Sequence, residues 1–157
     1  MSKKKKLLLI SSIGGHLTQL LQLESLFKQY DYHIVTEKSK VTLNLKDKHP
    51  VSYLVYGARN YPIRYIFKFS YNFLKSLFIF FRERPSIVIT TGAHTAVPMC
   101  YIAKMFGKKV IFIESFAKSS SPTLSGRLVY PIADLFIVQW ESMKEVYPKA
   151  VYGGTIY

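Results

Sequence analysis

The sequence contains one cysteine, few acidic residues and no long uninterrupted apolar run. A lone Cys100 cannot build an internal disulfide framework, which is compatible with a reducing cytoplasm. No segment reaches about 18 consecutive apolar residues, so a conventional transmembrane helix is not expected. The apolar run at 7–10 follows a lysine run at 3–6, but it ends in serines and glycines without an A-x-A cleavage site. It therefore predicts a buried strand and not a signal peptide.

Lysine and arginine outnumber aspartate and glutamate by 22 to 9, which gives a formal net charge of +13. Such an excess indicates an anionic partner, which can be nucleic acid, an acidic membrane surface or a phosphorylated substrate. The chain has 157 residues and is 49% hydrophobic, enough to bury one core, so we expect a single domain over residues 1–157. The four histidines lack close ligand spacing, so neither a metal site nor a cofactor is predicted.

Apolar, β-branched segments alternate with longer helical segments along the chain. The strands are expected at residues 7–11, 32–36, 51–56, 86–91, 109–114, 135–139 and 150–152. The helices are expected at residues 17–29, 62–82, 95–106, 123–130 and 142–147. Nearly continuous apolar strands between helices are typical of a parallel sheet covered on both faces, so we predict a single α/β, Rossmann-like domain. Ligands bind such sheets beyond the carboxyl ends of the strands, where the candidate polar sites lie.

The segment SSIGGHLT at residues 11–18 joins the first strand to the first helix. Gly14 and Gly15 let the backbone turn sharply and approach a ligand closely, while the helix N-terminus offers N–H groups and partial positive charge. A diphosphate suits this place, with His16 beside it. The spacing departs from the G-x-G-x-x-G fingerprint, so a turn without a ligand is the alternative interpretation.

The segment TTGAHTAVP at residues 90–98 repeats this arrangement around Gly92, after the fourth strand. Thr95 is expected to cap the following helix, which places His94 beside a second positive helix end. The alternative for His94 is a loop histidine bonded to backbone carbonyls. Glu114 ends the next strand, KVIFIE, where a carboxylate can bind sugar hydroxyls or act as a base. Its alternative is an ion pair with a neighbouring Lys or Arg.

Residues 62–82 are rich in aromatic side chains and predict a helix with one narrow basic stripe. At about 100° per residue, the four cations lie within about 40° of one another. These cations are Arg64, Lys68, Lys75 and Arg82. A helix in a bilayer interface needs aromatic side chains at headgroup depth and cations toward anionic lipid, so we expect membrane contact through these cations and Phe67, Phe73 and Phe78. The alternative is a core helix with one solvated face.

Taken together, several segments resemble the acceptor-side subunit of split glycosyltransferases in bacterial capsule and exopolysaccharide synthesis, the β-1,4-galactosyltransferase enhancer type. The segments are SSIGGHLTQL, Arg59-Asn60, TTGAHTAVP, IFIESFAKSSSPTLSGRLVYPIADLFIVQWESM and YGGTIY. The stretch LSGRLVYPIADLFIVQW is the specific part, whereas Gly-Gly-His alone is not. The chain is also similar to the eukaryotic membrane-anchoring subunit of the two-chain transferase that adds the second N-acetylglucosamine to dolichol-diphosphate sugar.

The resemblance implies a domain equivalent to the N-terminal, acceptor-binding half of a GT-B glycosyltransferase. Because the chain ends at Tyr157, where a linker to a donor domain would begin, a separate catalytic chain is expected to hold most of the UDP-sugar. The resemblance further implies an inverting, metal-independent transfer to a polyprenyl-diphosphate-linked saccharide at the cytoplasmic face of the cell membrane. The chain alone is not expected to be active.

For such a reaction, the expected positions of the loops at the sheet edge suggest roles for particular residues. Candidates for the catalytic base or for acceptor contacts are His16, His94 and Glu114. Candidates for binding the acceptor diphosphate are Gly14, Gly15, His16, Gly92 and Thr95. The residues expected to contact the partner chain are Gly153, Gly154, Ile156 and Tyr157.

Two other functions remain open on the sequence. Basic residues interleaved with aromatic ones can bind single-stranded nucleic acid. Here, however, the aromatic residues gather in one helix and no RNA-binding signature occurs, so nucleic acid is not the expected partner. The other alternative is a free-standing Rossmann enzyme that uses a soluble nucleotide, which tight UDP binding by the lone chain would support.

Overall fold

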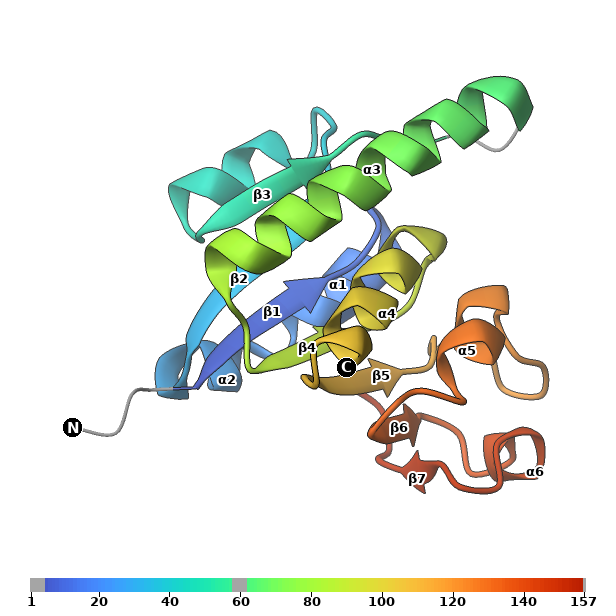
Figure 1. The fold of residues 1–157 in the computed structure, drawn as a ribbon. Helices are drawn as coiled ribbons and strands as arrows, with labels where there is room; N and C mark the ends of the chain where they lie inside the picture. The colour runs from blue at the N-terminus through green and yellow to red at the C-terminus, as the bar shows by residue number, and fades with distance from the viewer. Residues whose placement is uncertain (1–4, 58–61, 157) are drawn as a thin grey trace.

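The computed structural model describes residues 5–57 and 62–156, and its centre is one sheet of seven parallel strands (Figure 1). The strands are β1 (Lys6–Ile10), β2 (Asp31–Glu37), β3 (Val51–Leu54), β4 (Ile87–Thr90), β5 (Lys109–Ile113), β6 (Leu135–Val138) and β7 (Val151–Tyr152). Their order in the sheet is β3-β2-β1-β4-β5-β6-β7, so the direction of winding reverses between β1 and β4, as in a doubly wound fold. The prediction of an α/β, Rossmann-like domain is confirmed.

Helices cover both faces of this sheet. They are α1 (Gly15–Leu21), α2 (Glu24–Gln29), α3 (Pro62–Glu83), α4 (Val97–Met105), α5 (Leu124–Val129) and α6 (Met143–Val146), with the 3-10 helices η1 (Leu43–Asp47) and η2 (His94–Ala96). One core cluster joins the sheet to α3, α4, α5 and α6, and a second joins the opposite face to α1 and α2. In β1, Leu8 and Ile10 belong to the first cluster and Leu7 and Leu9 to the second. Both faces need apolar side chains, which explains the continuous apolar strands.

The prediction of one continuous helix over residues 17–29 is wrong, because two short helices occupy this segment. A turn at residues 22–23 separates α1 from α2. There the backbone amides of Gln22 and Leu23 donate to carbonyls three residues back, at 3.2 and 3.1 Å. Bonds of this kind tighten the backbone relative to an α-helix, so the α-helical hydrogen-bond pattern is interrupted at this turn.

The long helix α3 lies beside β3 and α4 (Figure 1). One side of it is buried, and another side, which is also apolar, is exposed. Ile79 and Phe80 pack in the first core cluster. The outward side carries seven apolar side chains that are between 40% and 73% exposed, namely Ile63, Ile66, Phe67, Phe73, Leu74, Phe78 and Phe81. We call these seven the α3 apolar face. Within residues 5–57 and 62–156, no helix is both long enough and apolar enough to cross a membrane.

The basic stripe of α3 lies on the side of the helix nearest β3. Nζ of Lys68 donates to the carbonyl oxygen of Tyr56 at 3.1 Å, and a guanidinium nitrogen of Arg82 donates to Oγ of Ser52 at 2.7 Å. The ammonium of Lys75 lies 5.6 Å from the centre of the Tyr71 ring. The stripe therefore borders the α3 apolar face, and two of its cations also fasten α3 to the segment around β3.

Candidate functional site

The loops that follow β1 and β4 are bonded to each other at the carboxyl edge of the sheet. Nδ1 of His16 lies 2.8 Å from the carbonyl oxygen of Thr91, and the Thr91 hydroxyl donates to the carbonyl oxygen of His16 at 2.6 Å. A Cβ on Gly92 would lie 3.2 Å from Cε1 of the His16 ring. This reciprocal pair, the His16–Thr91 pair, holds together two glycine loops that are 75 residues apart in the sequence.

The His16–Thr91 pair also orients the imidazole. Because a carbonyl oxygen only accepts hydrogen bonds, Nδ1 of His16 carries the hydrogen. In the neutral ring Nε2 then keeps its lone pair, which can accept a proton or a hydrogen bond. The side chain is partly exposed and lines a pocket, so this lone pair belongs to a ring that a ligand can reach.

Both glycine loops contain backbone conformations that side chains rarely adopt. Gly14, directly before α1, has φ 84° and ψ −143°. Ala93, directly before η2, has φ 87° and ψ 152°, and Gly92 has φ 106°. For a residue with a Cβ such a conformation costs on the order of 1–3 kcal/mol, and strain of this kind clusters at active sites and ligand clamps. Each loop thus has a residue with positive φ directly before a helix, and the strain falls on Ala93, which carries a Cβ.

A polar pocket of about 320 Å³ opens between these loops and the segment that follows β5. The residues that line it are Ser12, His16, Ala93, His94, Lys118, Pro122, Thr123, Leu124 and Ser125. Two predicted site residues, His16 and His94, therefore meet in one pocket. Lys118 was missed by the sequence analysis, and its only sequence signal is that it is the sole charged residue of the serine-rich segment 115–122.

The capping prediction for Thr95 is wrong. Thr95 lies inside the 3-10 helix η2, and Ala96 precedes the first residue of α4, with no side-chain cap. The Thr95 side chain is only 4% exposed, and its Oγ1 is buried without a hydrogen-bond partner. A 3-10 turn inserted before α4 displaces the threonine from the capping position, and its contact with a diphosphate stays a prediction.

Glu114 directly follows β5, which ends one residue earlier than predicted, and its side chain is buried. Its Oε1 accepts from the backbone amide of Ser115 at 2.8 Å and from the hydroxyl of Thr123 at 2.9 Å. Its Oε2 accepts from the hydroxyl of Tyr147 at 2.9 Å, and burial together with this carboxylate raises the pKa of Tyr147. Thr123 is the N-cap of α5 and lines the polar pocket, so Glu114 shapes the pocket wall from behind.

The network around Glu114 requires a glycine at position 126. A Cβ there would clash with Oε2 of Glu114 and would lie 2.5 Å from the hydroxyl oxygen of Tyr147 and 2.9 Å from Oγ1 of Thr123. Gly126→Ala should therefore lower the free energy of unfolding by about 3 kcal/mol, measured by urea denaturation.

The matched control for that substitution is Gly15→Ala. This glycine is also helical, and a Cβ there meets no atom within 4 Å, so its stability should stay the same or rise slightly. Equal stabilities of Gly126→Ala and Gly15→Ala would contradict the clash.

The tail predicted to contact a partner packs partly on its own chain. Ile156 joins the second core cluster, and its amide donates to Oε1 of Gln139 at 3.0 Å. A Cβ on Gly153 would lie 2.7 Å from Cγ2 of Ile137, whereas a Cβ on Gly154 would meet no atom within 4 Å. A bulky residue at position 153 would therefore disturb the attachment of β7, and a side chain at position 154 would strain a backbone that has φ 72°.

Two predicted features, Tyr157 and the Arg59-Asn60 pair, lie outside the described residues. Within the described part of the chain, no group of three or more His, Cys, Asp or Glu side chains is placed to hold a metal ion. The lone Cys100 is completely buried, and this burial raises the pKa of its thiol to about 12. Its position in the first core cluster gives it a packing role.

A family model described as "Oligosaccharide biosynthesis protein Alg14 like" matches residues 35–156. The chain belongs to this Alg14-like family. The UDP-N-acetylglucosamine transferase subunit ALG14 of Mus musculus is 31% identical in an alignment of 179 residues. The alignment covers 96% of this chain and 82% of the mouse protein. The subunit of the same name from Candida albicans is 40% identical over 92 residues, which cover 55% of this chain and 42% of the yeast protein. The predicted similarity to the eukaryotic subunit is confirmed.

The fold of this chain is similar to part of several solved enzyme structures. A UDP-N-acetylglucosamine 2-epimerase from Rickettsia bellii matches with a TM-score of 0.74 and 15% identity, over 98% of this chain and 46% of the epimerase chain. MurG from Acinetobacter baumannii matches with a TM-score of 0.72 and 14% identity, over 88% of this chain and 42% of the MurG chain. The chain thus spans less than half of each of these proteins. The predicted fold, like the N-terminal half of a GT-B glycosyltransferase, is confirmed.

Proposed function

We propose that this Alg14-like chain is the acceptor-binding and recruiting subunit of a two-chain UDP-sugar glycosyltransferase. The complex would extend a polyprenyl-diphosphate-linked oligosaccharide at the cytoplasmic face of the cell membrane. The observation that carries the proposal is the polar pocket between the paired glycine loops, in a chain whose relatives are named as subunits of a UDP-N-acetylglucosamine transferase. A role in capsular or exopolysaccharide biosynthesis rests on the sequence resemblance alone.

The polar pocket has the chemistry to receive a diphosphate. Lys118 contributes a positive charge, and His16 and His94 contribute hydrogen-bonding imidazoles from the two loops. Backbone N–H groups at the start of α1, after Gly14, are further donors of the kind that bind phosphate oxygens, whereas the amide of Gly92 donates to Oγ1 of Thr90 at 3.0 Å. The formal net charge of +13 attracts anionic ligands and anionic lipid at longer range.

His16 is the best-placed base for an inverting transfer. In such a step the acceptor hydroxyl oxygen attacks the anomeric carbon of the UDP-sugar, the bond from that carbon to the diphosphate oxygen breaks, and UDP leaves. The proton of the attacking hydroxyl must pass to a base, and Nε2 of His16 has the lone pair to take it. His94 lines the same pocket and is the second candidate, while the buried Glu114 acts as a positioning residue for Thr123.

Membrane contact through α3 fits the same proposal. The α3 apolar face offers side chains that a bilayer interface would bury, and the cations Arg64, Lys68, Lys75 and Arg82 border it on one side. Apolar burial combined with cations near anionic headgroups is the arrangement of interfacial helices. A lipid-linked acceptor would then reach the polar pocket without leaving the membrane surface.

The family match favours neither alternative function. For a nucleic-acid-binding module, aromatic residues would be expected on a continuous basic surface, whereas here four of the six exposed phenylalanines of the described residues belong to the α3 apolar face. For a free-standing nucleotide enzyme, the relatives would not be expected to be named as subunits. Contact with the donor-binding chain through Gly153, Gly154, Ile156 and Tyr157 remains part of the proposal.

Reconstitution tests the proposal. The chain, a donor-binding subunit from the same organism, and the two together should each be assayed with a polyprenyl-diphosphate-linked saccharide and with UDP-galactose, UDP-glucose or UDP-GlcNAc. Transfer should occur only when both chains are present, because each holds one substrate. Robust transfer by the lone chain would contradict the two-chain proposal.

A further inference from the structure

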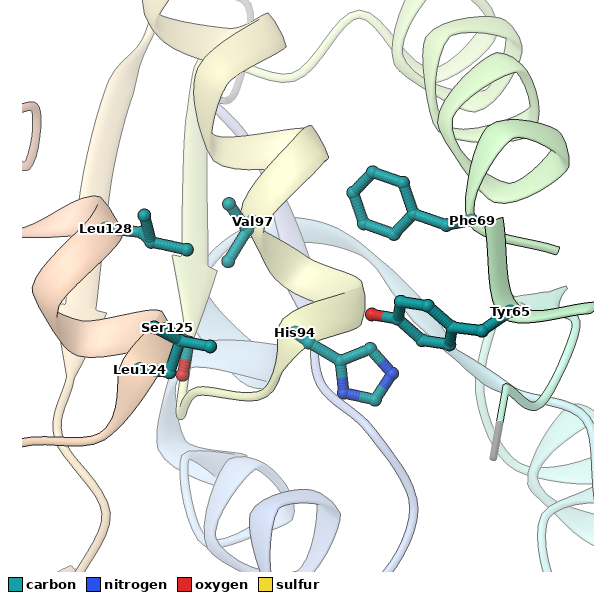
Figure 2. A pocket seen from close by; sticks show the side chains of 7 residues that line it. All are labelled: Tyr65, Phe69, His94, Val97, Leu124, Ser125 and Leu128. Carbon is teal, nitrogen blue, oxygen red and sulfur yellow. The ribbon is translucent and has the colours of Figure 1, made fainter. Parts of the chain in front are cut away.

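A second pocket, which is almost entirely apolar, shares lining residues with the polar one. Figure 2 shows the side chains that line this second pocket. Its volume is about 390 Å³, and it lies between the N-terminal part of α3, the start of α4 and the helix α5. The side chains that line it are Tyr65, Phe69, His94, Val97, Leu124, Ser125 and Leu128. It is open on one side, so a ligand can enter it without a change of fold.

The two pockets are neighbours that differ in polarity. His94, Leu124 and Ser125 line both of them, so they adjoin along a shared wall. On the polar side this wall faces His16 and Lys118, and on the other side it faces aromatic and branched aliphatic groups. A ligand that fills both must be anionic at one end and apolar at the other.

The apolar pocket also continues toward the α3 apolar face. Tyr65 and Phe69 reach into the pocket from α3, and the same stretch of helix carries Ile66 and Phe67 on its outward side, 63% and 73% exposed. The ring of Tyr65 lies 5.8 Å from the ring of His94, so the helix that is proposed to contact lipid forms part of the pocket wall. Because the apolar pocket lies next to the α3 apolar face, a lipid chain is a more fitting ligand than a soluble apolar molecule.

We propose that the apolar pocket binds the first isoprene units of the acceptor's polyprenyl chain, with the attached diphosphate in the polar pocket. The inference rests on the proposed function and goes beyond it, because it makes the lipid a recognised part of the substrate and not only an anchor. Methyl-branched isoprene units suit a lining of aromatic rings and branched aliphatic side chains. The first units would be lifted from the membrane while the rest of the chain stays in it.

The test compares two acceptors in the reconstituted two-chain complex. Both carry the same saccharide diphosphate, and one ends in a methyl group while the other ends in a farnesyl group of three isoprene units. With detergent absent, the wild-type complex should show a KM for the farnesyl acceptor at least about 10-fold below that for the methyl acceptor, because only the farnesyl group buries apolar surface. Equal KM values would overturn the proposal.

The pocket itself is tested with Phe69→Gln and Leu128→Gln together, because these two side chains line the apolar pocket and not the polar one. They are 36% and 44% exposed, so the double variant should fold. It should raise the KM of the farnesyl acceptor about 10-fold and leave that of the methyl acceptor unchanged. Met105→Gln, on the surface of α4 and 77% exposed, is the matched control and should change neither value.

The outcomes separate this inference from the proposed function. If the double variant raises both KM values equally, or weakens association with the donor-binding subunit, the pocket holds part of that subunit and the isoprene proposal is overturned. If the wild-type complex transfers sugar to both acceptors with equal KM values, the proposed function is supported and the isoprene proposal is overturned. If neither acceptor is used, the proposed function itself fails.

Discussion

Replacing His16 with glutamine should lower the turnover rate of the reconstituted two-chain complex by a factor of about 100 or more. A glutamine amide can still donate to the carbonyl oxygen of Thr91, so the pairing of the two glycine loops can persist. Glutamine cannot accept a proton from the acceptor hydroxyl, which removes the function proposed for Nε2. Steady-state rates at saturating substrate measure the effect.

His49→Gln is the matched control for this variant. His49 follows η1, bonds to the Tyr32 hydroxyl at 3.0 Å and lies at the opposite edge of the sheet, before the start of β3. The turnover rate of the complex that carries His49→Gln should equal that of the wild-type complex. A His16→Gln complex with an undiminished rate would exclude His16 as the base and direct attention to His94.

Changing Phe67, Leu74 and Phe78 together to glutamine should release the chain from anionic vesicles, with the partition coefficient falling about 1,000-fold. The three side chains are 73%, 64% and 64% exposed, so the fold does not need them. Burying each in a bilayer interface contributes about 1.5 kcal/mol, and about 1.4 kcal/mol corresponds to a factor of ten. Sedimentation with vesicles of mixed anionic and neutral lipid measures the coefficient.

The control for the membrane variant is Val41→Gln combined with Met105→Gln. These residues are 80% and 77% exposed, yet they lie outside the α3 apolar face. Their replacement should leave vesicle binding unchanged. If both variants lose vesicle binding equally, binding depends on the total exposed apolar surface and not on α3. If the α3 variant binds vesicles as well as the wild type does, α3 is not the membrane contact.

The strands could be predicted closely because a doubly covered parallel sheet needs apolar residues at nearly every position. The predicted strand at 7–11 and the observed β1, Lys6–Ile10, differ by one residue at each end. The predicted helix at 17–29 could not be divided correctly, because leucines at helical spacing continue through the turn at 22–23. What ends α1 is a pair of backbone hydrogen bonds, which leave no mark in the side-chain pattern.

The candidate site was predictable only as a set of loops at one edge of the sheet. Strand polarity places the segments after β1, β4 and β5 together, but it does not show that His16 pairs with Thr91. The buried position of Glu114 depends on Thr123 and Tyr147, which come from later segments. Lys118 is an ordinary loop lysine in the sequence and becomes notable only beside the two histidines.

The central claim is that this chain holds the acceptor while another chain holds the nucleotide. Calorimetric titration of the lone chain with a farnesyl-diphosphate-linked saccharide, and separately with UDP-GlcNAc, tests it most directly. The account predicts saturable binding of the acceptor, with an affinity for the UDP-sugar that is about 100-fold weaker or not measurable, a difference of about 2.7 kcal/mol or more. Tight binding of UDP-GlcNAc without binding of the acceptor would contradict the account and favour a free-standing nucleotide enzyme.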